Sequence, residues 1–394
     1  MLAQDIASAV RKRILRLIDS GDWRSYDGRQ ADELCKRLAA CVNQPYCQLA
    51  SSGSAALEIG LRAAGIGPGD EVILSAYDYP GNFWAIERAG ARPVLVDITG
   101  DSWNIDLSQL AAAVAHANSP KALIASHLHG MVQPIPELRN WCQQHGITLI
   151  EDACQALGGK AYDGPVGSSG EMCILSFGGS KTISAGRGGA VLSNDPALAQ
   201  RIRLAAGAGS GPYAMSEMQC AAVLAQLDYL DALNQLSNLF FRKLDSWLRT
   251  AWSDLSSPRW HSTDYSAPAY YQAGWLLPKL NNMQTQLDAR ETFLMKVSQN
   301  SSFHLGIGFP GFHRRSARRC RIATAANDCS NVDKIPLLNT LDIQSRTVVM
   351  SFQQALLHAD QCEDPIRPAG LMEGSEFADL LRRCWQTSAS QHVE

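Results

Sequence analysis

The fold of this chain can be predicted from residues 147–193, which read ITLIEDACQALGGKAYDGPVGSSGEMCILSFGGSKTISAGRGGAVLS. Three short apolar runs lie in this stretch, at Ile147–Glu151, Met172–Phe177 and Ala190–Ser193. Runs of this length, bounded by glycine and small polar residues, are typical of buried strands. Polar and reactive side chains follow the first two runs directly. The stretch therefore predicts a buried sheet with a chemically active edge.

The same pattern extends upstream of this stretch. Four more apolar runs precede it, and segments with helical spacing separate most of them. The runs are Tyr46–Ala50, Glu71–Ser75, Pro93–Asp97 and Ala122–Ser126, and the helical segments are Ser54–Ala64, Leu107–Ala117 and Ile135–His145. Strands that alternate with helices form a mostly parallel sheet covered on both faces. The sequence therefore predicts an α/β protein with a mostly parallel seven-stranded sheet.

Two further regions flank this α/β unit. Residues 2–17 have apolar residues on one side of a helix and arginines elsewhere, which favours a docking helix over a targeting peptide. After Ser216 the pattern indicates one or two packed helices, and beyond about residue 250 it becomes irregular. We therefore expect a large domain at 1–250, with an N-terminal helical segment, and a smaller C-terminal α+β domain at 251–394.

Composition and charge limit the classes of function. The chain has 394 residues, 46% of them hydrophobic, and a formal net charge of -3. It is no disordered polymer, and its charge gives no support for binding nucleic acid or an anionic membrane. No apolar run approaches the ~20 residues that a membrane span needs. The eleven cysteines contain no CxxC pair, which favours reduced thiols in a cytosolic protein over a zinc ribbon or a disulfide framework.

Lys181 is the first candidate for chemistry. It follows the strand-end segment Ser176–Ser180, and Gly186–Gly189 lead into the next strand, so the lysine lies on a tight glycine-rich loop. A lysine held there against a sheet edge is suited to Schiff-base chemistry, although most lysines are exposed and solvated. A phosphate-binding loop of the GxxxxGK[ST] type is not supported, because positions 175 and 180 are leucine and serine.

A carboxylate, an anion site and an aromatic ring accompany the lysine. Asp152, at the end of a buried strand, is suited to partner a pyridinium nitrogen, although such an acid also caps helices. Residues 51–57, SSGSAAL, pass from strand to helix through small residues and present N–H groups to an anion, with an ordinary serine cap as the alternative. Tyr79, just past another strand, is placed to stack on a planar ring unless it belongs to the core.

In their order along the chain, these motifs resemble the DegT/DnrJ/StrS family of fold-type I aminotransferases, which depend on pyridoxal 5'-phosphate (PLP). The resemblance covers about residues 25–250 and rests on GSAAL at 53–57, GDEVI at 69–73, Tyr79, EDACQA at 151–156, Ser176-Phe177 and Lys181. It implies that Lys181 forms the Schiff base and moves the proton, and that Asp152 binds the pyridine nitrogen. It also places Gln155 near the phenolic oxygen, Tyr79 on the ring face, and Ser54, Ser176 and the backbone of Gly53, Ser54 and Ala55 around the phosphate.

Three positions depart from the family's usual pattern. Gly178 stands where many members have histidine. Arg187 replaces a common acidic residue, and it either binds a substrate carboxylate or faces solvent. The family usually has an asparagine before the aromatic residue of the segment at 211–213 and supplies it to the neighbouring subunit's phosphate site. This chain has Pro212 there instead. A homodimer with active sites at the subunit interface is still expected, but without this contact.

Two polar clusters allow more than one interpretation. The basic cluster at 313–321, HRRSARRCR, either meets a phosphate or carboxylate of the substrate or forms a solvated face. His127 and His129 form a His-x-His pair after a strand, but no third ligand is evident. We therefore expect structural or substrate-adjacent histidines and no metal site.

The resemblance implies a cytoplasmic PLP-dependent aminotransferase. Its small-molecule substrates would be an amino donor, glutamate or glutamine, and a keto acceptor, a nucleotide-linked sugar or a cyclitol. Lys181 favours amino transfer, because the family's sugar dehydratases carry histidine at that position. One alternative is dehydration or another PLP reaction on the same fold. The other is a non-catalytic homologue that acts as a binding or regulatory subunit.

Overall fold

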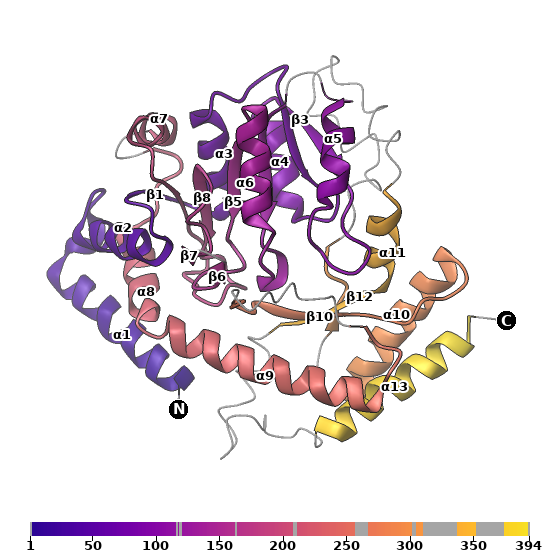
Figure 1. The fold of residues 1–394 in the computed structure, drawn as a ribbon. Coiled ribbons are helices and arrows are strands. Elements are labelled where there is room, and N and C mark those ends of the chain that lie inside the picture. Colours follow the sequence, from indigo (N-terminus) through magenta and orange to yellow (C-terminus); the bar gives the residue numbers. More distant parts are fainter. Residues whose placement is uncertain are drawn as a thin grey trace.

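A seven-stranded sheet lies at the centre of the larger part of the molecule (Figure 1). The computed structural model describes residues 2–115, 117, 120–161, 164–207, 211–256, 267–301, 305–309, 337–351 and 374–392. The strands are β1 (Tyr46–Ala50), β2 (Glu71–Ser75), β3 (Arg92–Val96), β4 (Pro120–Ser126), β5 (Thr148–Asp152), β8 (Met172–Ser176) and β9 (Gly189–Ser193). Their order is β1-β9-β8-β5-β4-β2-β3. β9 runs antiparallel to both of its neighbours, and the other adjacent pairs are parallel.

This sheet confirms the predicted fold class. All seven predicted strands belong to it, and β1 and β2 have the predicted bounds. The bounds of the other five differ by one or two residues from the prediction. The short hairpin of β6 (Lys160–Ala161) and β7 (Gly164–Pro165) forms a separate two-stranded sheet between β5 and β8 in the chain.

Helices cover both faces of the sheet because its strands alternate their apolar side chains between the faces. On β2, Val72 and Leu74 belong to one hydrophobic cluster and Ile73 to another on the opposite face. The first face carries α3 (Gly53–Ala63), α4 (Pro80–Arg88) and α7 (Pro196–Ala206). The opposite face carries α2 (Arg29–Val42), α5 (Leu107–Ala115), α6 (Ile135–His145) and α8 (Glu217–Leu227).

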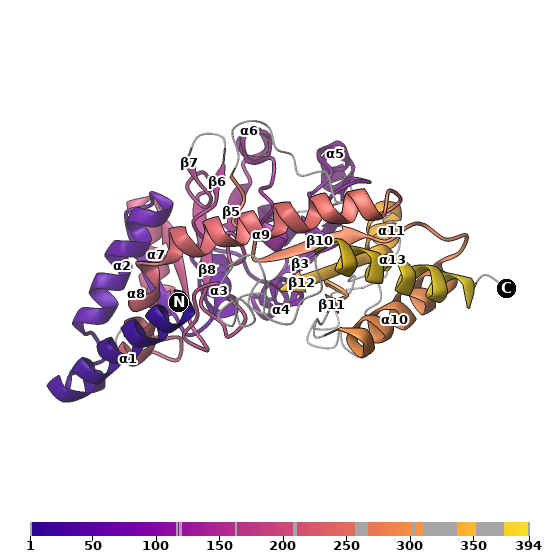
Figure 2. The same ribbon diagram turned by 90° about the horizontal axis from the view of Figure 1, so that it is seen from below.

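One helix precedes this layered unit in the chain, and another leads from it to the smaller part. The predicted docking helix is α1 (Leu2–Ser20), which packs against α8 and is followed by the short turn η1 (Asp22–Arg24). The long helix α9 (Leu230–Ala251) follows α8 and runs beneath both sheets towards α13 (Gly374–Ser390), as Figures 1 and 2 show. The predicted helical region after Ser216 thus consists of two helices, α8 and α9.

The smaller, C-terminal part contains a three-stranded antiparallel sheet. Its strands are β10 (Gln272–Leu276), β11 (Leu305–Gly306) and β12 (Thr347–Ser351), in the order β10-β12-β11, and its helices are α10 (Met283–Asn300), α11 (Leu338–Arg346) and α13. Trp252, Phe293 and Trp385 form the centre of its core. Phe241 and Leu248 of α9 belong to the same core. A division at 250/251 therefore stays a proposal, because α9 contributes to both parts.

Some sequence features concern only part of the described chain. Within the described ranges, no helix combines the length and apolarity that a bilayer span requires. The eight cysteines in these ranges are free thiols. The predicted basic cluster at 313–321 lies outside the described residues.

Candidate active site

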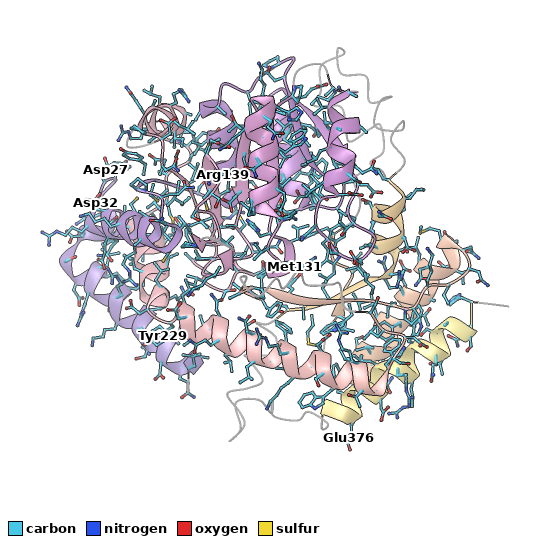
Figure 3. All side chains as sticks on the ribbon, in the orientation of Figure 1. Asp27, Asp32, Met131, Arg139, Tyr229 and Glu376 are labelled. Atoms are coloured by element: carbon cyan, nitrogen blue, oxygen red, sulfur yellow. The ribbon has the colours of Figure 1, made fainter. Side chains whose placement is uncertain are left out.

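The carboxyl ends of four parallel strands bring polar side chains together at one edge of the large sheet. β2 leads into Asp78 and Tyr79, β4 ends at Ser126, β5 ends at Asp152, and β8 ends at Ser176. Parallel strands place their carboxyl ends at the same edge, where open α/β sheets bind ligands. Met131, which follows β4 and the turn η2 (Leu128–Gly130), lies between the large sheet and β10 (Figure 3). This edge therefore faces the smaller sheet.

The acidic pair at the end of β5 separates into two roles. Asp152 faces the site, where one oxygen, Oδ1, accepts the N–H of Cys154 at 3.0 Å and the other, Oδ2, accepts from Nδ2 of Asn82 at 2.8 Å. Glu151 accepts the N–H groups of Gly167 and Ser169 at 3.0 and 2.7 Å instead. Successive residues of a strand point to opposite faces, so one carboxylate orders a loop and the other is left to the site.

His127 belongs to the structural side of this pair. Its Nδ1 accepts the N–H of Gln133 at 3.1 Å, so its proton lies on Nε2, which donates to Glu151 at 3.1 Å. Burial opposes the ionisation of Glu151. The hydrogen bond from His127, with those from the N–H groups of Gly170 and Gly167, outweighs burial and holds its pKa below the ordinary value.

The first turn of α3, at Gly53 and Ser54, lies against Ser176 at the end of β8, and we call these residues the cradle. The N–H groups of Gly53 and Ser54 have no intrahelical acceptor, and no other acceptor within the described ranges meets them. The N–H of Ala55, the third predicted donor, donates to Oγ of Ser52 at 3.1 Å. A Cβ on Gly53 would lie 2.8 Å from Cβ of Ser176. Only glycine lets the helix start this close to β8.

Lys181 lies on the predicted loop and meets the smaller part of the molecule. Its Nζ lies 4.6 Å from the centroid of the Tyr271 ring, and the hydroxyl of Tyr271 donates to Oγ of Ser180 at 2.8 Å. Burial raises the pKa of the Cys154 thiol, Asp152 raises it further, and Lys181 opposes this effect. Gly53 lies beside both Ser176, which precedes the loop of Lys181, and Cys154, whose N–H donates to Asp152, so Lys181 and Asp152 flank the same cradle.

Tyr79 lies beside the cradle and is exposed to solvent. Its side chain is 42% exposed, and its ring centroid lies 5.9 Å from that of Phe309 in an edge-on arrangement. A Cβ on Gly81 would collide with the Tyr79 ring and would lie 2.9 Å from Oγ of Ser54. The glycine at the start of α4 thus lets Tyr79 lie next to the first turn of α3.

Gln155 is oriented by the backbone of His129. Oε1 of Gln155 accepts the N–H of His129 at 2.8 Å, so Nε2, the donor end of the amide, is left for another group. His129 itself has a positive φ of 59°. Among the predicted cofactor-binding residues, Gln155 is therefore one whose donor end is fixed before any ligand binds.

The side chain of His129 joins the two parts of the molecule. Nδ1 donates to Oε1 of Gln272 at 3.0 Å, and Nε2 accepts from the hydroxyl of Tyr77 at 3.2 Å. Burial lowers the pKa of His129 to about 4, and Lys181 acts in the same direction. His127 and His129 thus serve different partners. In the described ranges, no three His, Cys, Asp or Glu side chains are grouped as metal ligands.

Sequence reasoning missed three residues behind Asp152. Asp78, Asn82 and Ser126 form a buried hydrogen-bonded cluster with it. Asp78 and Asn82 are close in sequence to Tyr79, the predicted ring-stacking residue. Their spacing of four residues at the start of a helix, directly after a buried strand, is the signal that could have identified them.

Two of the departures from the family pattern lie on the surface. The side chain of Arg187 is exposed, and its backbone carbonyl accepts from Nε2 of Gln219 at 3.2 Å. Pro212 is exposed as well, next to Tyr213, whose carbonyl accepts the N–H of Ser51 at 2.6 Å. The segment at 211–213 therefore contacts the end of β1 in its own chain.

Comparison with known proteins gives a consistent family. Residues 4–336 match the DegT/DnrJ/EryC1/StrS aminotransferase family. The pleiotropic regulatory protein of Geobacillus stearothermophilus is 38% identical over 191 residues, which are 46% of this chain and 51% of that protein. GDP-perosamine synthase of Caulobacter vibrioides is 33% identical over 233 residues, 56% of this chain and 62% of that enzyme. The matches thus span about half to two thirds of these relatives.

The fold also matches solved structures over nearly the whole chain. The PLP form of a putative sugar aminotransferase, Spr1654 from Streptococcus pneumoniae, superposes with a TM-score of 0.77. The match covers 98% of this chain and 97% of that one at 20% identity, so it bears on the fold alone.

Proposed function

This chain belongs to the DegT/DnrJ/EryC1/StrS aminotransferase family, and from this premise we propose that it is a PLP-dependent aminotransferase. It takes an amino group from glutamate or glutamine and delivers it to the keto group of a nucleotide-linked sugar or of a cyclitol. The observation that carries the proposal is the gathering of Lys181, Asp152 and the Gly53–Ser54 cradle at one sheet edge. A relative that is named GDP-perosamine synthase supports the sugar acceptor.

The residues present fit PLP group by group. The free N–H groups of Gly53 and Ser54, at a helix N-terminus, suit a phosphate, and the hydroxyls of Ser54 and Ser176 lie beside them. The Asp152 carboxylate, held at both oxygens, suits a protonated ring nitrogen. Nε2 of Gln155 suits the phenolic oxygen, since it is the donor end of the amide. Tyr79, beside the cradle, would cover the ring face.

The side chains around Lys181 would then perform the proton chemistry. Bound PLP supplies the carbon that receives the amino group and a ring that withdraws electrons. Nζ of Lys181 would hold the cofactor covalently, and its amine, when free, would accept and return the proton of the substrate carbon. Asp152 would hold the ring nitrogen in its protonated form, which would strengthen the electron withdrawal. The ring of Tyr271 holds the ammonium form of Lys181 near the site.

The direct test is a Lys181→Ala variant. We expect the purified wild-type protein to gain a visible absorption band with PLP, and glutamate or glutamine to convert this band to that of pyridoxamine phosphate. Lys181→Ala should fold but lose turnover by at least about 1000-fold, since both its bond and its proton transfer are removed. The exposed Lys36 on α2 offers a control, Lys36→Ala, that should behave as wild type. A wild-type protein that never binds PLP would refute the proposal.

Two alternatives are separated by the products. Water loss from a sugar without consumption of the donor would indicate dehydration. A protein that binds PLP but converts no donor would point to a regulatory role, the function suggested by the name of the Geobacillus relative. Stoichiometric formation of 2-oxoglutarate and an amine supports transfer.

A cytoplasmic homodimer is part of the proposal. Several apolar side chains on α1 and in the segment that follows it are exposed: Leu15, Ile18, Trp23 and Tyr26. Such side chains suit a surface that a second copy covers. Light scattering on the purified protein should give twice the mass of 42.8 kDa.

A further inference from the structure

A second buried carboxylate lies behind Asp152. Asp78 is fully buried, and Asn82, Ser126 and Asp152 are 4 to 6% exposed. Oδ1 of Asp78 accepts the N–H of Tyr79 at 2.6 Å and Nδ2 of Asn82 at 3.0 Å, and Oδ2 accepts from the hydroxyl of Ser126 at 2.8 Å. These four side chains come from three neighbouring strand ends and the first turn of α4.

Asn82 connects the two carboxyl groups. Its Nδ2 lies 2.8 Å from Oδ2 of Asp152 and 3.0 Å from Oδ1 of Asp78. The hydroxyl oxygen of Ser126 is a third partner, 3.1 Å from Nδ2. Since all three partners are oxygens that can accept, the orientation of the amide follows from its surroundings. The second oxygen of Asp152 is fixed by the N–H of Cys154 at 3.0 Å. The plane of the Asp152 carboxylate thus depends on where Asn82 is held.

Asp78 and Asp152 are buried carboxyl groups that contact the same amide nitrogen. Ionising both would cost more free energy than ionising one, because each is desolvated and their charges repel. Burial raises the pKa of Asp78, and the charge of Asp152 raises it further. Asp152 is the charged group that acts on Asp78, from β5. The other neighbours, Ser126 of β4 and Asn82 of α4, are neutral, and His127 is turned to Glu151. The proton belongs on Oδ2, because Oδ1 already accepts two N–H groups. In this neutral form Oδ2 donates to the hydroxyl oxygen of Ser126, so the direction of that 2.8 Å bond is the reverse of the one it has with a carboxylate.

We propose that Asp78 is a positioning residue for Asp152: as a neutral carboxylic acid it anchors Asn82, and Asn82 fixes the Asp152 carboxylate towards the cofactor ring. This role rests on the proposed function, since it assumes that Asp152 meets a ring nitrogen. Asp78 itself touches neither cofactor nor substrate. Its neutral form leaves Asp152 as the single negative charge of the pair, which suits one cationic partner.

The first experiment uses the cofactor-free protein. A carboxyl with a raised folded-state pKa stabilises the fold below its unfolded pKa of ~3.9, and this stability is lost as pH rises through the folded-state pKa. The urea midpoint of wild type should therefore fall relative to that of Asp78→Asn as pH rises from about 4 to 8. Parallel profiles for the two proteins would overturn the proposal, whether or not PLP binds.

The second experiment measures the dissociation constant of PLP by its visible absorbance. Asp78→Ala should raise this constant about tenfold or more, because it releases Asn82. Asp78→Asn should stay within about threefold of wild type, since the amide copies the hydrogen bonds of a neutral acid. In an Asn82→Ala background, Asp78→Ala should add no further loss. Ser126→Ala removes the contacts of the hydroxyl with Asp78 and Asn82 but leaves both bonds between Asn82 and the carboxyl groups, so it should have an intermediate effect.

Equal losses in Asp78→Ala and Asp78→Asn, or no loss in either, would overturn the positioning role. If wild type binds no PLP at all, the proposed function fails, and the pH profiles of the cofactor-free proteins still decide whether Asp78 is the neutral member of the pair. The two failures are therefore distinguishable.

Discussion

Chemically similar side chains at neighbouring positions of this chain have different roles. Glu151 and Asp152 both lie at the buried end of β5, yet one holds the loop at 167–170 and the other faces the site. The same holds for His127, which supports Glu151, and His129, which supports Gln155. At the residue scale, the role of a side chain depends on the direction in which it points and on the hydrogen-bonding groups that it meets there.

His129 gives a pH-dependent prediction at this scale. Burial lowers its pKa to about 4 from an ordinary value near 6.5. The unfolded chain then takes up the proton first, so stability from the neutral ring is lost as pH falls from 6.5 towards 4. Between these values, wild type should lose about 3 kcal/mol of unfolding free energy relative to His129→Asn. Asparagine is chosen because it tolerates the positive φ of 59°.

Urea unfolding of the cofactor-free proteins at pH 7, 5.5 and 4 measures this difference. His145→Asn is the matched control, since the His145 side chain is exposed at the end of α6. A wild-type to His129→Asn difference that stays constant with pH would contradict the buried, neutral state of His129.

At the scale of elements, the cradle depends on how closely β9 approaches α3. Gly189, the first residue of β9, lies opposite Ala50 of β1 and Ser176 of β8. A Cβ at Gly189 would lie 2.5 Å from the carbonyl of Ser52 and 2.7 Å from the N atom of Gly53. These are backbone atoms, which cannot rotate away as a side chain can.

Gly189→Ala should therefore destabilise the fold by about 1–3 kcal/mol, and it should weaken PLP binding because the collision lies at the cradle. Gly67→Ala is the control, since a Cβ there meets nothing within 4 Å. Urea unfolding and PLP titration of both variants check the prediction. Equal stability of the two variants would show that the β9 backbone moves freely away from α3.

The elements of the large sheet were predictable, and the contacts between them were less so. Strands such as β2 are continuous apolar runs between turn residues, so periodicity located all seven and gave helix α6 its observed bounds. The cluster of Asp78 with Asn82 is different, because it depends on which strand ends become neighbours. The order β5-β4-β2 is no property of any single segment. The positive φ of His129 has no sequence signal either, since histidine rarely adopts it.

At the scale of the whole molecule, the smaller part completes the site. Tyr271 contacts Lys181 and Ser180, and Gln272 contacts His129. Both residues lie at the start of β10, which the predicted division would assign to the C-terminal domain. The site therefore depends on how firmly the two parts are joined, and the sequence pattern beyond about residue 250 gave no indication of this.

Asp97 joins the two parts next to this site. Its Oδ1 accepts the N–H and the hydroxyl of Thr340 at 2.7 and 2.6 Å, and Oδ2 accepts the N–H of Asn339 at 3.0 Å. A carboxylate that follows β3 in the large part thus caps α11 of the smaller part. α11 in turn reaches β10 through the carbonyl of Arg346, which accepts the N–H of Leu277 at 2.9 Å.

Asp97→Ala should lower the unfolding free energy by about 3 kcal/mol, because it removes a buried charge-assisted cap and leaves N–H groups unpaired. Asp195→Ala is the matched control: Asp195 caps α7 within the large part, through the N–H of Ala197 at 2.8 Å, and its loss should cost about 1 kcal/mol. Hydrogen exchange should become faster in α11 and β10 of the Asp97 variant and stay slow in the large sheet. If exchange rises evenly over both parts, or if the two variants lose the same stability, Asp97 is an ordinary cap and the parts are held together elsewhere.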